Sequence, residues 1–278
     1  MSSRKDLLKA FDIHIKTNHT EFVPKSNHIR VMTWNVQMFK DYKQNFRMND
    51  MFALLINSNA DVVFLCEALF NSDYRQQFDS YVKTTHFKYI EFVNPKYGIN
   101  LVLSKHPIVK KQIISLPKDP IKNQSRYGIA VSIKINESAN LLKIVGTHLD
   151  VYDETENTRK QQIDQIMKLI DHEYIILGDF NSLRQSDYSK HMWDRIVSDD
   201  LVRHVNTQNQ VTHSIESNGW VDSFVICNKT PPTVSVWSMR RVDYIYIGQH
   251  TPHKIVDTNI HVTNISDHFP IYVDLLVK

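Results

Sequence analysis

Short segments rich in β-branched and aromatic residues recur along the chain and are bounded by turn residues. Several alternate apolar and polar side chains, as in AVSIKI at residues 130–135. This pattern is typical of β-strands. We therefore expect strands at residues 28–36, 61–67, 86–93, 98–104, 127–135, 141–149, 174–179, 241–248 and 268–277.

Helical periodicity is confined to fewer segments. Residues 46–56 and 158–170 carry apolar side chains three and four positions apart, which predicts amphipathic helices. Near the N-terminus, Leu7, Leu8 and Phe11 would share one side of a further short helix. Such a stripe is more often packed on the parent domain than on a membrane surface.

The balance of these elements predicts the fold class. Strands outnumber helices and often follow one another directly, which disfavours a single doubly wound parallel sheet. We expect an α/β protein in which two sheets pack face to face and helices cover their outer sides. Residues 182–238 show the least regular pattern, and such long excursions often form the rim of a site.

Composition limits the class of protein. The chain has 278 residues, 42% of them hydrophobic and 23% charged, which is enough apolar material for a buried core and excludes a largely disordered protein. No internal repeat or flexible linker divides the sequence. We expect one domain at residues 25–278, preceded by an extension at residues 1–24 that includes the short helix.

Charge and cysteine content narrow the setting. The 33 basic and 30 acidic residues give a net charge of +3, so a site for a polyanion would have to be a local patch. Two cysteines cannot build a disulfide scaffold and indicate a reducing compartment. No segment has the length and hydrophobicity of a membrane span or the features of a secretory signal. We expect a soluble, intracellular protein, cytoplasmic or nuclear, without stable membrane insertion.

Polar residues fall where the predicted strands begin or end. Taken singly, each would be a turn former, a helix cap or a satisfied imidazole. Together they would be costly to hold in one place without a cation or a ligand, because clustered carboxylates repel one another and lose solvation. The residues in question are Asn35, Glu67, His148, Asp150, Asp179, Asn181, Asp243, Asp267 and His268.

These residues lie in an ordered set of motifs. The set comprises TWN at 33–35, a glutamate closing an apolar strand at 67, THLD at 147–150, GDFN at 178–181, RVDYI at 241–245 and SDH at 266–268. In order and spacing it resembles the endonuclease/exonuclease/phosphatase superfamily over residues 29–276. The resemblance implies the DNase I-like fold, a four-layer α/β sandwich of two mixed sheets flanked by helices.

The resemblance also implies a divalent cation, usually Mg²⁺, with Mn²⁺ as a substitute. Glu67 corresponds to the principal metal carboxylate, Asn35 to a supporting group, and Asp267 to a second or alternate ligand. Independently of the resemblance, these three side chains offer only oxygen donors, which suit a hard cation better than zinc.

Catalytic roles are likewise implied by the resemblance. Asp179 would orient and deprotonate the attacking water, and Asn181 would position water or phosphate. His268, held by Asp243, would donate to a phosphate oxygen, and His148 would contact the phosphate or protonate the leaving oxygen.

For two candidate substrate-binding residues, a purely structural role fits the sequence as well. Arg126 resembles a phosphate-facing arginine but fits equally a solvated strand end, and Asp150 either enters the site or bonds the turn after His148.

The function expected from the resemblance is hydrolysis of a phosphodiester by in-line attack of water, acting as a monomer. We favour nucleic acid as the substrate, in the manner of an endonuclease, an exonuclease or a tyrosyl-DNA phosphodiesterase. The sequence VQMF at 36–39 and the THLD motif disfavour an abasic-site endonuclease. A sphingomyelinase-like or inositol-phosphate phosphoesterase is the alternative, and a non-catalytic phosphate-binding scaffold is a third.

Basic and aromatic residues after the first motif are candidates for contacting a nucleic-acid backbone, although an ordinary solvated loop explains them at least as well. They are Lys40, Tyr42, Lys43, Phe46 and Arg47, with Arg184 further along the chain.

Overall fold

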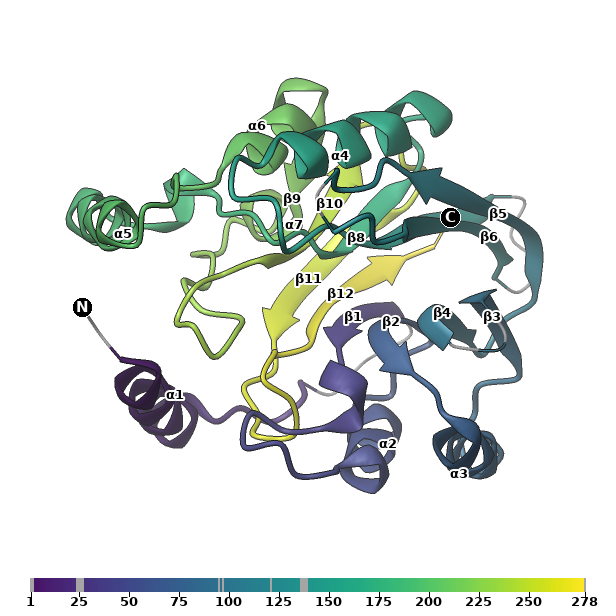
Figure 1. Cartoon of the computed structure of the whole chain (residues 1–278). Helices are drawn as coiled ribbons and strands as arrows, with labels where there is room; N and C mark the ends of the chain where they lie inside the picture. The colour runs from purple at the N-terminus through teal and green to yellow at the C-terminus, as the bar shows by residue number, and fades with distance from the viewer. Residues whose placement is uncertain are drawn as a thin grey trace.

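A computed structural model of the chain describes residues 3–23, 28–94, 96, 98–120, 122–135 and 140–277. Two six-stranded mixed sheets pack against each other, and helices lie on both outer sides (Figure 1). The expected four-layer arrangement is therefore confirmed. Among the described residues, no helix combines the length and the hydrophobicity needed to cross a bilayer.

The first sheet has the strand order β11-β12-β1-β2-β4-β3. The chain passes through its strands in the order β1 (Ile29–Asn35), β2 (Val62–Leu69), β3 (Tyr89–Asn94), β4 (Gly98–Ser104), β11 (Lys254–Ile260) and β12 (Ile271–Leu276). β1 and β2 are parallel and the other neighbours are antiparallel. α2 (Met48–Asn57) and α3 (Ser72–Val82) cover its outer side, at the bottom of Figure 1.

The second sheet has the strand order β5-β6-β7-β8-β10-β9. Its strands are β5 (Ile108–Leu116), β6 (Arg126–Lys134), β7 (Leu141–His148), β8 (Ile175–Asp179), β9 (Trp220–Asp222) and β10 (Asp243–Gly248). β7 and β8 are parallel and the other neighbours are antiparallel. α4 (Asn157–Leu169) and α6 (Gln210–Ser217) cover its outer side, at the top of Figure 1.

Alternation along the strands builds three apolar layers. In β1, Met32 and Trp34 face the layer under α2 and α3, whereas Val31 faces the layer between the sheets. In β8, Ile175 and Leu177 face the layer between the sheets, and Ile176 faces the layer under α4 and α6. Because side chains alternate between the faces of a strand, each strand fills two layers at once.

The N-terminal segment forms α1 (Arg4–Asn18), which begins with a capping box between Ser3 and Asp6. Its buried Phe11 stacks on Phe269, with ring centroids 5.0 Å apart, and the Tyr42 hydroxyl donates a hydrogen bond to Asp12. The helix therefore packs on the body of the molecule next to the residues that follow the SDH motif.

Several elements differ from the sequence-based expectation. The segment at 182–238 is more regular than expected, because it contains η2 (Gln185–Asp187), α5 (Lys190–Val202), α6, β9 and α7 (Ser223–Ile226), although loops lie between and after them. The border strand β5 was also missed, because its exposed middle carries Lys110, Lys111 and Gln112 and lacks a strand-like apolar pattern.

Candidate active site

The parallel strand pairs bring the motif residues to one end of the sandwich. Asn35 ends β1, while His148 and Asp179 end β7 and β8 as paired residues. Asp243, the first residue of β10, pairs with Asp179 from the other side. Neighbouring strands thus place three of the predicted catalytic side chains next to one another.

Glu67 is positioned by an irregularity in β2. The strand does not end at this residue, as we expected, but runs on to Leu69 with a change of register between Leu65 and Ala68. Glu67 has a positive φ of 54°. Such a bulge redirects a side chain that regular alternation would point elsewhere. The Glu67 side chain remains 32% exposed, more than the side chains it approaches.

A glycine permits the close pairing of β7 and β8. Gly178 has φ of 141°, and a Cβ atom there would lie 1.9 Å from the Thr147 carbonyl oxygen. Only glycine adopts this conformation without strain. The GDFN motif therefore needs its glycine to bring Asp179 alongside His148.

Asn35 links the two sheets through its side-chain amide. Nδ2 donates to Glu67 Oε1 and to Asp179 Oδ2, each at 3.0 Å. Oδ1 accepts a hydrogen bond from the backbone N–H of Gln37 at 3.0 Å. In this arrangement Asn35 presents nitrogen to the carboxylates, so a metal–oxygen contact would require its amide to turn over.

His268 belongs to a chain of buried hydrogen bonds. Its Nδ1 lies 2.9 Å from Asp243 Oδ2, which also accepts a 2.6 Å hydrogen bond from Ser235 Oγ. Ser235 Oγ in turn accepts from the backbone N–H of Val242 at 3.0 Å. Sequence reasoning missed Ser235, since a serine in an irregular loop carries no signal of this role.

The charge of His268 follows from its neighbours. Burial alone would lower the pKa of His268, but the negative charges of Asp243, Asp267 and Asp179 raise it well above its usual value. The ring is therefore held as an imidazolium with both N–H groups available. Its Nε2 lies 3.8 Å from Asp179 Oδ2 and 4.0 Å from Asp267 Oδ1.

His148 differs from His268 in its charge state. Burial lowers the pKa of His148 to about 3, and Arg126 opposes protonation as well, so the ring is neutral. Arg126 Nη1 lies 3.3 Å from Nδ1, where the guanidinium can only donate. The proton then sits on Nε2, which lies 3.6 Å from Asp179 Oδ2 and 3.8 Å from Glu67 Oε1.

Asp150 is enclosed rather than open to a ligand. Its side chain is 0% exposed, and Oδ1 accepts hydrogen bonds from the backbone N–H groups of Tyr152 and Asp153 at 2.7 and 2.9 Å. Oδ2 lies 4.0 Å from Arg126 Nε. Oδ1 thus bonds the turn after His148, whereas Oδ2 has no hydrogen-bond partner within the described part of the chain and faces Arg126.

Asn181 lies at the edge of the same centre. Its backbone N–H donates to Asp179 Oδ1 at 3.0 Å, and its Nδ2 donates to the Leu149 carbonyl at 3.2 Å. These contacts join the residue after β8 to the turn after β7, and they hold the Asp179 carboxylate from a second direction.

The donor set fits a hard divalent cation. Burial raises the pKa of Asp267 to about 7, and the charges of Glu67, Asp179 and Asp243 act in the same direction. Burial and the charge of Asp243 also raise the pKa of Asp179. Each carboxylate thus stands in excess negative charge, which a cation would neutralise.

The placement of candidate ligand atoms also supports a cation site. Among the described residues, Asp179, Asp243 and His268 bring one candidate ligand atom each within 4.8 Å of one another. Because His268 Nδ1 is already bonded to Asp243, the oxygen atoms of the cluster are the better donors.

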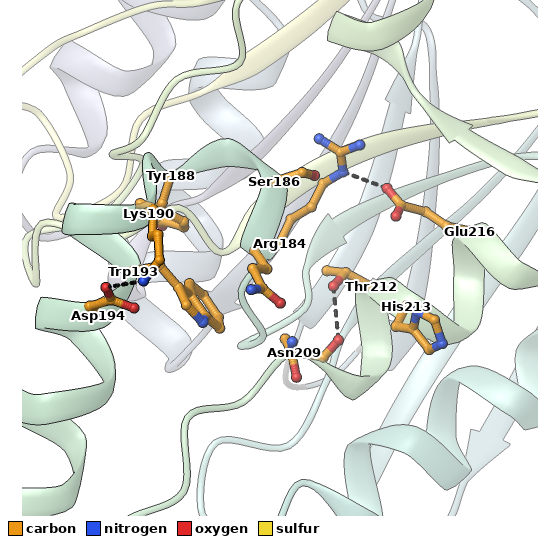
Figure 2. Close-up of a pocket in the computed structure, with 11 residues that line it drawn as sticks. Arg184, Ser186, Tyr188, Lys190, Trp193, Asp194, Asn209, Thr212, His213 and Glu216 are labelled. Carbon is orange, nitrogen blue, oxygen red and sulfur yellow. Dashed lines mark hydrogen bonds and ion pairs between the residues drawn. The ribbon is translucent and has the colours of Figure 1, made fainter.

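The cavity volumes do not point to the predicted catalytic and metal residues. A cavity of about 640 Å³ lies between the start of α5 and α6, with Trp193 on one side and Thr212 and His213 on the other (Figure 2). None of the predicted catalytic or metal residues lines it. A smaller cavity of about 350 Å³ includes Asn181 and adjoins the centre.

The two packed sheets with their outer helices define the class of fold, a DNase I-like α/β sandwich, and a buried acid–histidine cluster lies at one end of it. The chain belongs to the Endonuclease/Exonuclease/phosphatase family, whose model matches residues 32–268. Members of this family are in general hydrolytic phosphoesterases. The family expected from the motifs is thereby confirmed. No curated protein matches the sequence.

Solved structures share the fold at low sequence identity. An endonuclease/exonuclease/phosphatase from Beutenbergia cavernae superposes with a TM-score of 0.68 at 18% identity, covering 91% of this chain and 72% of that one. D. rerio TDP2 complexed with a single-strand DNA product gives 0.63 at 16% identity, over 91% and 100%. Sphingomyelinase C from Streptomyces griseocarneus gives 0.60 at 14% identity, over 90% and 99%.

Proposed function

We propose that the protein is a Mg²⁺-dependent phosphodiesterase that hydrolyses nucleic acid by in-line attack of water and acts as a monomer. The observation that carries this proposal is the position of Asp179. Its buried carboxylate lies 3.6 Å from a neutral histidine and 3.8 Å from a charged one, next to the half-exposed Glu67. Such a group of a base and two distinct N–H donors suits hydrolysis of a phosphate ester.

Asp179 is proposed as the general base. Burial and the Asp243 charge raise its pKa, which makes it a stronger proton acceptor than an exposed aspartate. Asn35 Nδ2 and the Asn181 backbone N–H each hold one of its oxygens. Water held against Asp179 would lose its proton to this carboxylate as it attacks phosphorus.

The two histidines act on the phosphate. The His268 imidazolium donates from Nε2 to a non-bridging oxygen, while Asp243 and Ser235 hold the ring from the other side. Neutral His148 donates from Nε2, with Arg126 fixing its tautomer. Arg126 also contributes positive charge on the side of the substrate.

A bound divalent cation would neutralise phosphate charge and activate the phosphorus for attack. Glu67 and Asp267 are the proposed protein ligands, and Asn35 keeps the Glu67 carboxylate in place. Mn²⁺ is expected to substitute for Mg²⁺, since the donors are oxygen atoms.

The nucleic-acid part of the proposal rests on the fold shared with TDP2, seen with a single-strand DNA product. The basic and aromatic residues after the first motif give it little support. Tyr42 is buried, and Lys43 is paired with Asp12. Arg47 is paired with Asp50 and Arg184 with Glu216.

A substrate panel tests the proposal. Full-length protein with Mg²⁺ is incubated with bis(p-nitrophenyl) phosphate, single-stranded DNA, RNA, 5′-tyrosyl DNA, sphingomyelin vesicles and inositol phosphates, and Asp179→Asn serves as the control. We expect EDTA-sensitive hydrolysis of DNA or RNA that the variant lacks. Hydrolysis of sphingomyelin or inositol phosphate alone would replace nucleic acid by the alternative substrate, and no hydrolysis at all would favour a binding scaffold.

A further inference from the structure

The turn after β7 exposes two large apolar side chains within four residues of His148. Val151 is 51% exposed and Tyr152 is 48% exposed, although Asp150, at the start of the same turn, is deeply buried. Single exposed apolar residues are ordinary on a protein surface. Two adjacent ones beside a reactive centre form a candidate contact surface for a ligand.

The turn is held firmly from beneath. Asp150 Oδ1 accepts from the Tyr152 and Asp153 backbone N–H groups, and Arg159 Nη1 and Nη2 donate to the carbonyls of Asp150 and Asp153 at 2.8 and 2.6 Å. The backbone N–H of Asp150 donates to Gln162 Oε1 at 2.9 Å. The exposure of Val151 and Tyr152 therefore belongs to an ordered turn, which loses little conformational entropy when it binds a ligand.

The turn also adjoins the reactive centre. The Leu149 backbone N–H donates to the Asp179 carbonyl at 3.0 Å, and the Leu149 carbonyl accepts from Asn181 Nδ2. Val151 lines the cavity of about 350 Å³ that includes Asn181. A substrate that extends from the reacting phosphate past Asn181 would reach this turn first.

The charges nearby favour one kind of substrate group. Lys122 Nζ lies 5.9 Å from the centre of the Tyr152 ring, and Arg126 lies beside His148. An aromatic ring next to cations suits a nucleotide, whose base stacks on the ring while its phosphate faces the positive charge. An acyl chain would instead require a wider apolar patch without such cations.

We propose that Val151 and Tyr152 form a platform for the nucleobase next to the reacting phosphate. This inference rests on the proposed function and names the part of the substrate that the turn recognises. Tyr152 stacks on the base, Val151 contacts its edge toward the cavity, and Asp150 serves the site by shaping the turn rather than by touching the substrate.

The test compares Tyr152→Ala and Tyr152→Trp with the unaltered protein on three substrates. These are a single-stranded DNA oligonucleotide, an oligonucleotide of equal length with abasic residues only, and an aliphatic phosphodiester that carries no ring. Loss of one stacking contact should raise KM for the DNA about tenfold in Tyr152→Ala, with little change in kcat. Tyr152→Trp should keep the KM of the unaltered protein, and both variants should treat the other two substrates as the unaltered protein does.

Tyr89→Ala is the matched control, because Tyr89 is also exposed, at 38%, but lies on β3. It should change none of the three activities. If the unaltered protein cleaves DNA and Tyr152→Ala does so with the same KM, the platform is refuted and the nuclease function stands. Equal losses on all three substrates would also refute it, since they would indicate damage to the reactive centre. Failure of the unaltered protein to cleave nucleic acid would overturn the proposed function and the platform together.

Discussion

The two sheets are built to the same pattern and differ in the chemistry they carry. Read across each sheet, two antiparallel pairings are followed by one parallel pairing and two more antiparallel ones. A helix connects the parallel strands in both, α2 in the first sheet and α4 in the second. The sequence shows no corresponding repeat, so the likeness lies in the backbone alone.

The parallel pairs end in different surroundings. In the first sheet the bulge at Glu67 leaves a carboxylate half-exposed, where a hydrated cation can reach it. In the second sheet His148 and Asp179 are almost fully enclosed, and burial shifts the pKa of both. One backbone pattern can thus support the proposed cation binding or the proposed proton transfer, depending on how deeply its strand ends are buried.

The largest expected effect is on the first sheet. Glu67→Ala should lower kcat/KM for bis(p-nitrophenyl) phosphate by about 10⁴-fold at millimolar Mg²⁺, because the proposed principal cation ligand is lost. Raising the Mg²⁺ concentration should restore part of the activity. Isothermal titration calorimetry with Mg²⁺ and steady-state kinetics measure both effects. Full activity of the variant at low Mg²⁺ would show that Glu67 is not part of the site.

The matching change in the second sheet is Asp179→Asn. It should lower kcat by about 10³-fold, since a general base contributes roughly this much, and added Mg²⁺ should not restore it. The shape is kept because the amide is isosteric with the carboxylate. Rescue of Asp179→Asn by Mg²⁺ would contradict the separation of roles between the two sheets.

Gly178→Ala tests the backbone of the second sheet. A Cβ there would meet the Thr147 carbonyl oxygen at a positive φ, so we expect a loss of about 3 kcal/mol in the free energy of unfolding. Gly128→Ala in β6 is the control, since its Cβ would have neighbours at 3.5 Å or more. Urea unfolding of both variants measures the difference, and equal losses would show that the close β7–β8 approach is not the cause.

Asp243→Asn tests how a residue of the second sheet controls His268, which lies between two strands of the first sheet. His268 stands before β12, and its imidazolium depends on the Asp243 charge. We expect kcat to fall about 10²-fold while the fold is retained. Nuclear magnetic resonance of the His268 ring should show a lowered pKa. An unaltered ring pKa would mean that Asp243 does not set the charge of His268.

The smallest effect concerns stability at mildly acidic pH. His261, after β11 in the first sheet, stacks on Phe22, and burial lowers the pKa of His261 to about 4. The unfolded chain binds this proton more tightly, so stability falls as pH drops below the ordinary histidine value. Between pH 7 and 5.5 His261 should account for about 1 kcal/mol of that fall. His261→Phe should flatten the pH dependence of urea unfolding by this amount, and an identical slope would exclude His261 as its source.

Sequence reasoning found the motif residues because each stands at a sharp change between apolar and polar residues where a predicted strand begins or ends. The structure brings Asn35, Glu67, Asp179 and His268 together through strand register. Alternation along β1 also explains why Trp34, next to Asn35, points into the core and is fully buried. The local sequence pattern was sufficient to predict the place of a residue wherever the backbone is regular.

The remaining features depend on contacts distant in sequence. The bulge at Glu67 arises from pairing with β4, and the role of Ser235 arises from its approach to Asp243. Tyr42 was a candidate for substrate contact but is buried under α1. No local pattern encodes these relations, since each is set by packing between elements that the chain brings together only on folding.

The position of β12 has a consequence for how the molecule is assembled during synthesis. This strand comes last among the described elements, yet it lies inside the first sheet, between β1 and β11. While the ribosome is still making residues 271–276, the β1 edge facing β12 stays unpaired, and such an edge is prone to aggregation. The segment with Asp267 and His268 immediately precedes that strand. The nascent chain would therefore acquire its reactive centre only after the segment before β12 has been made and β12 has joined the first sheet.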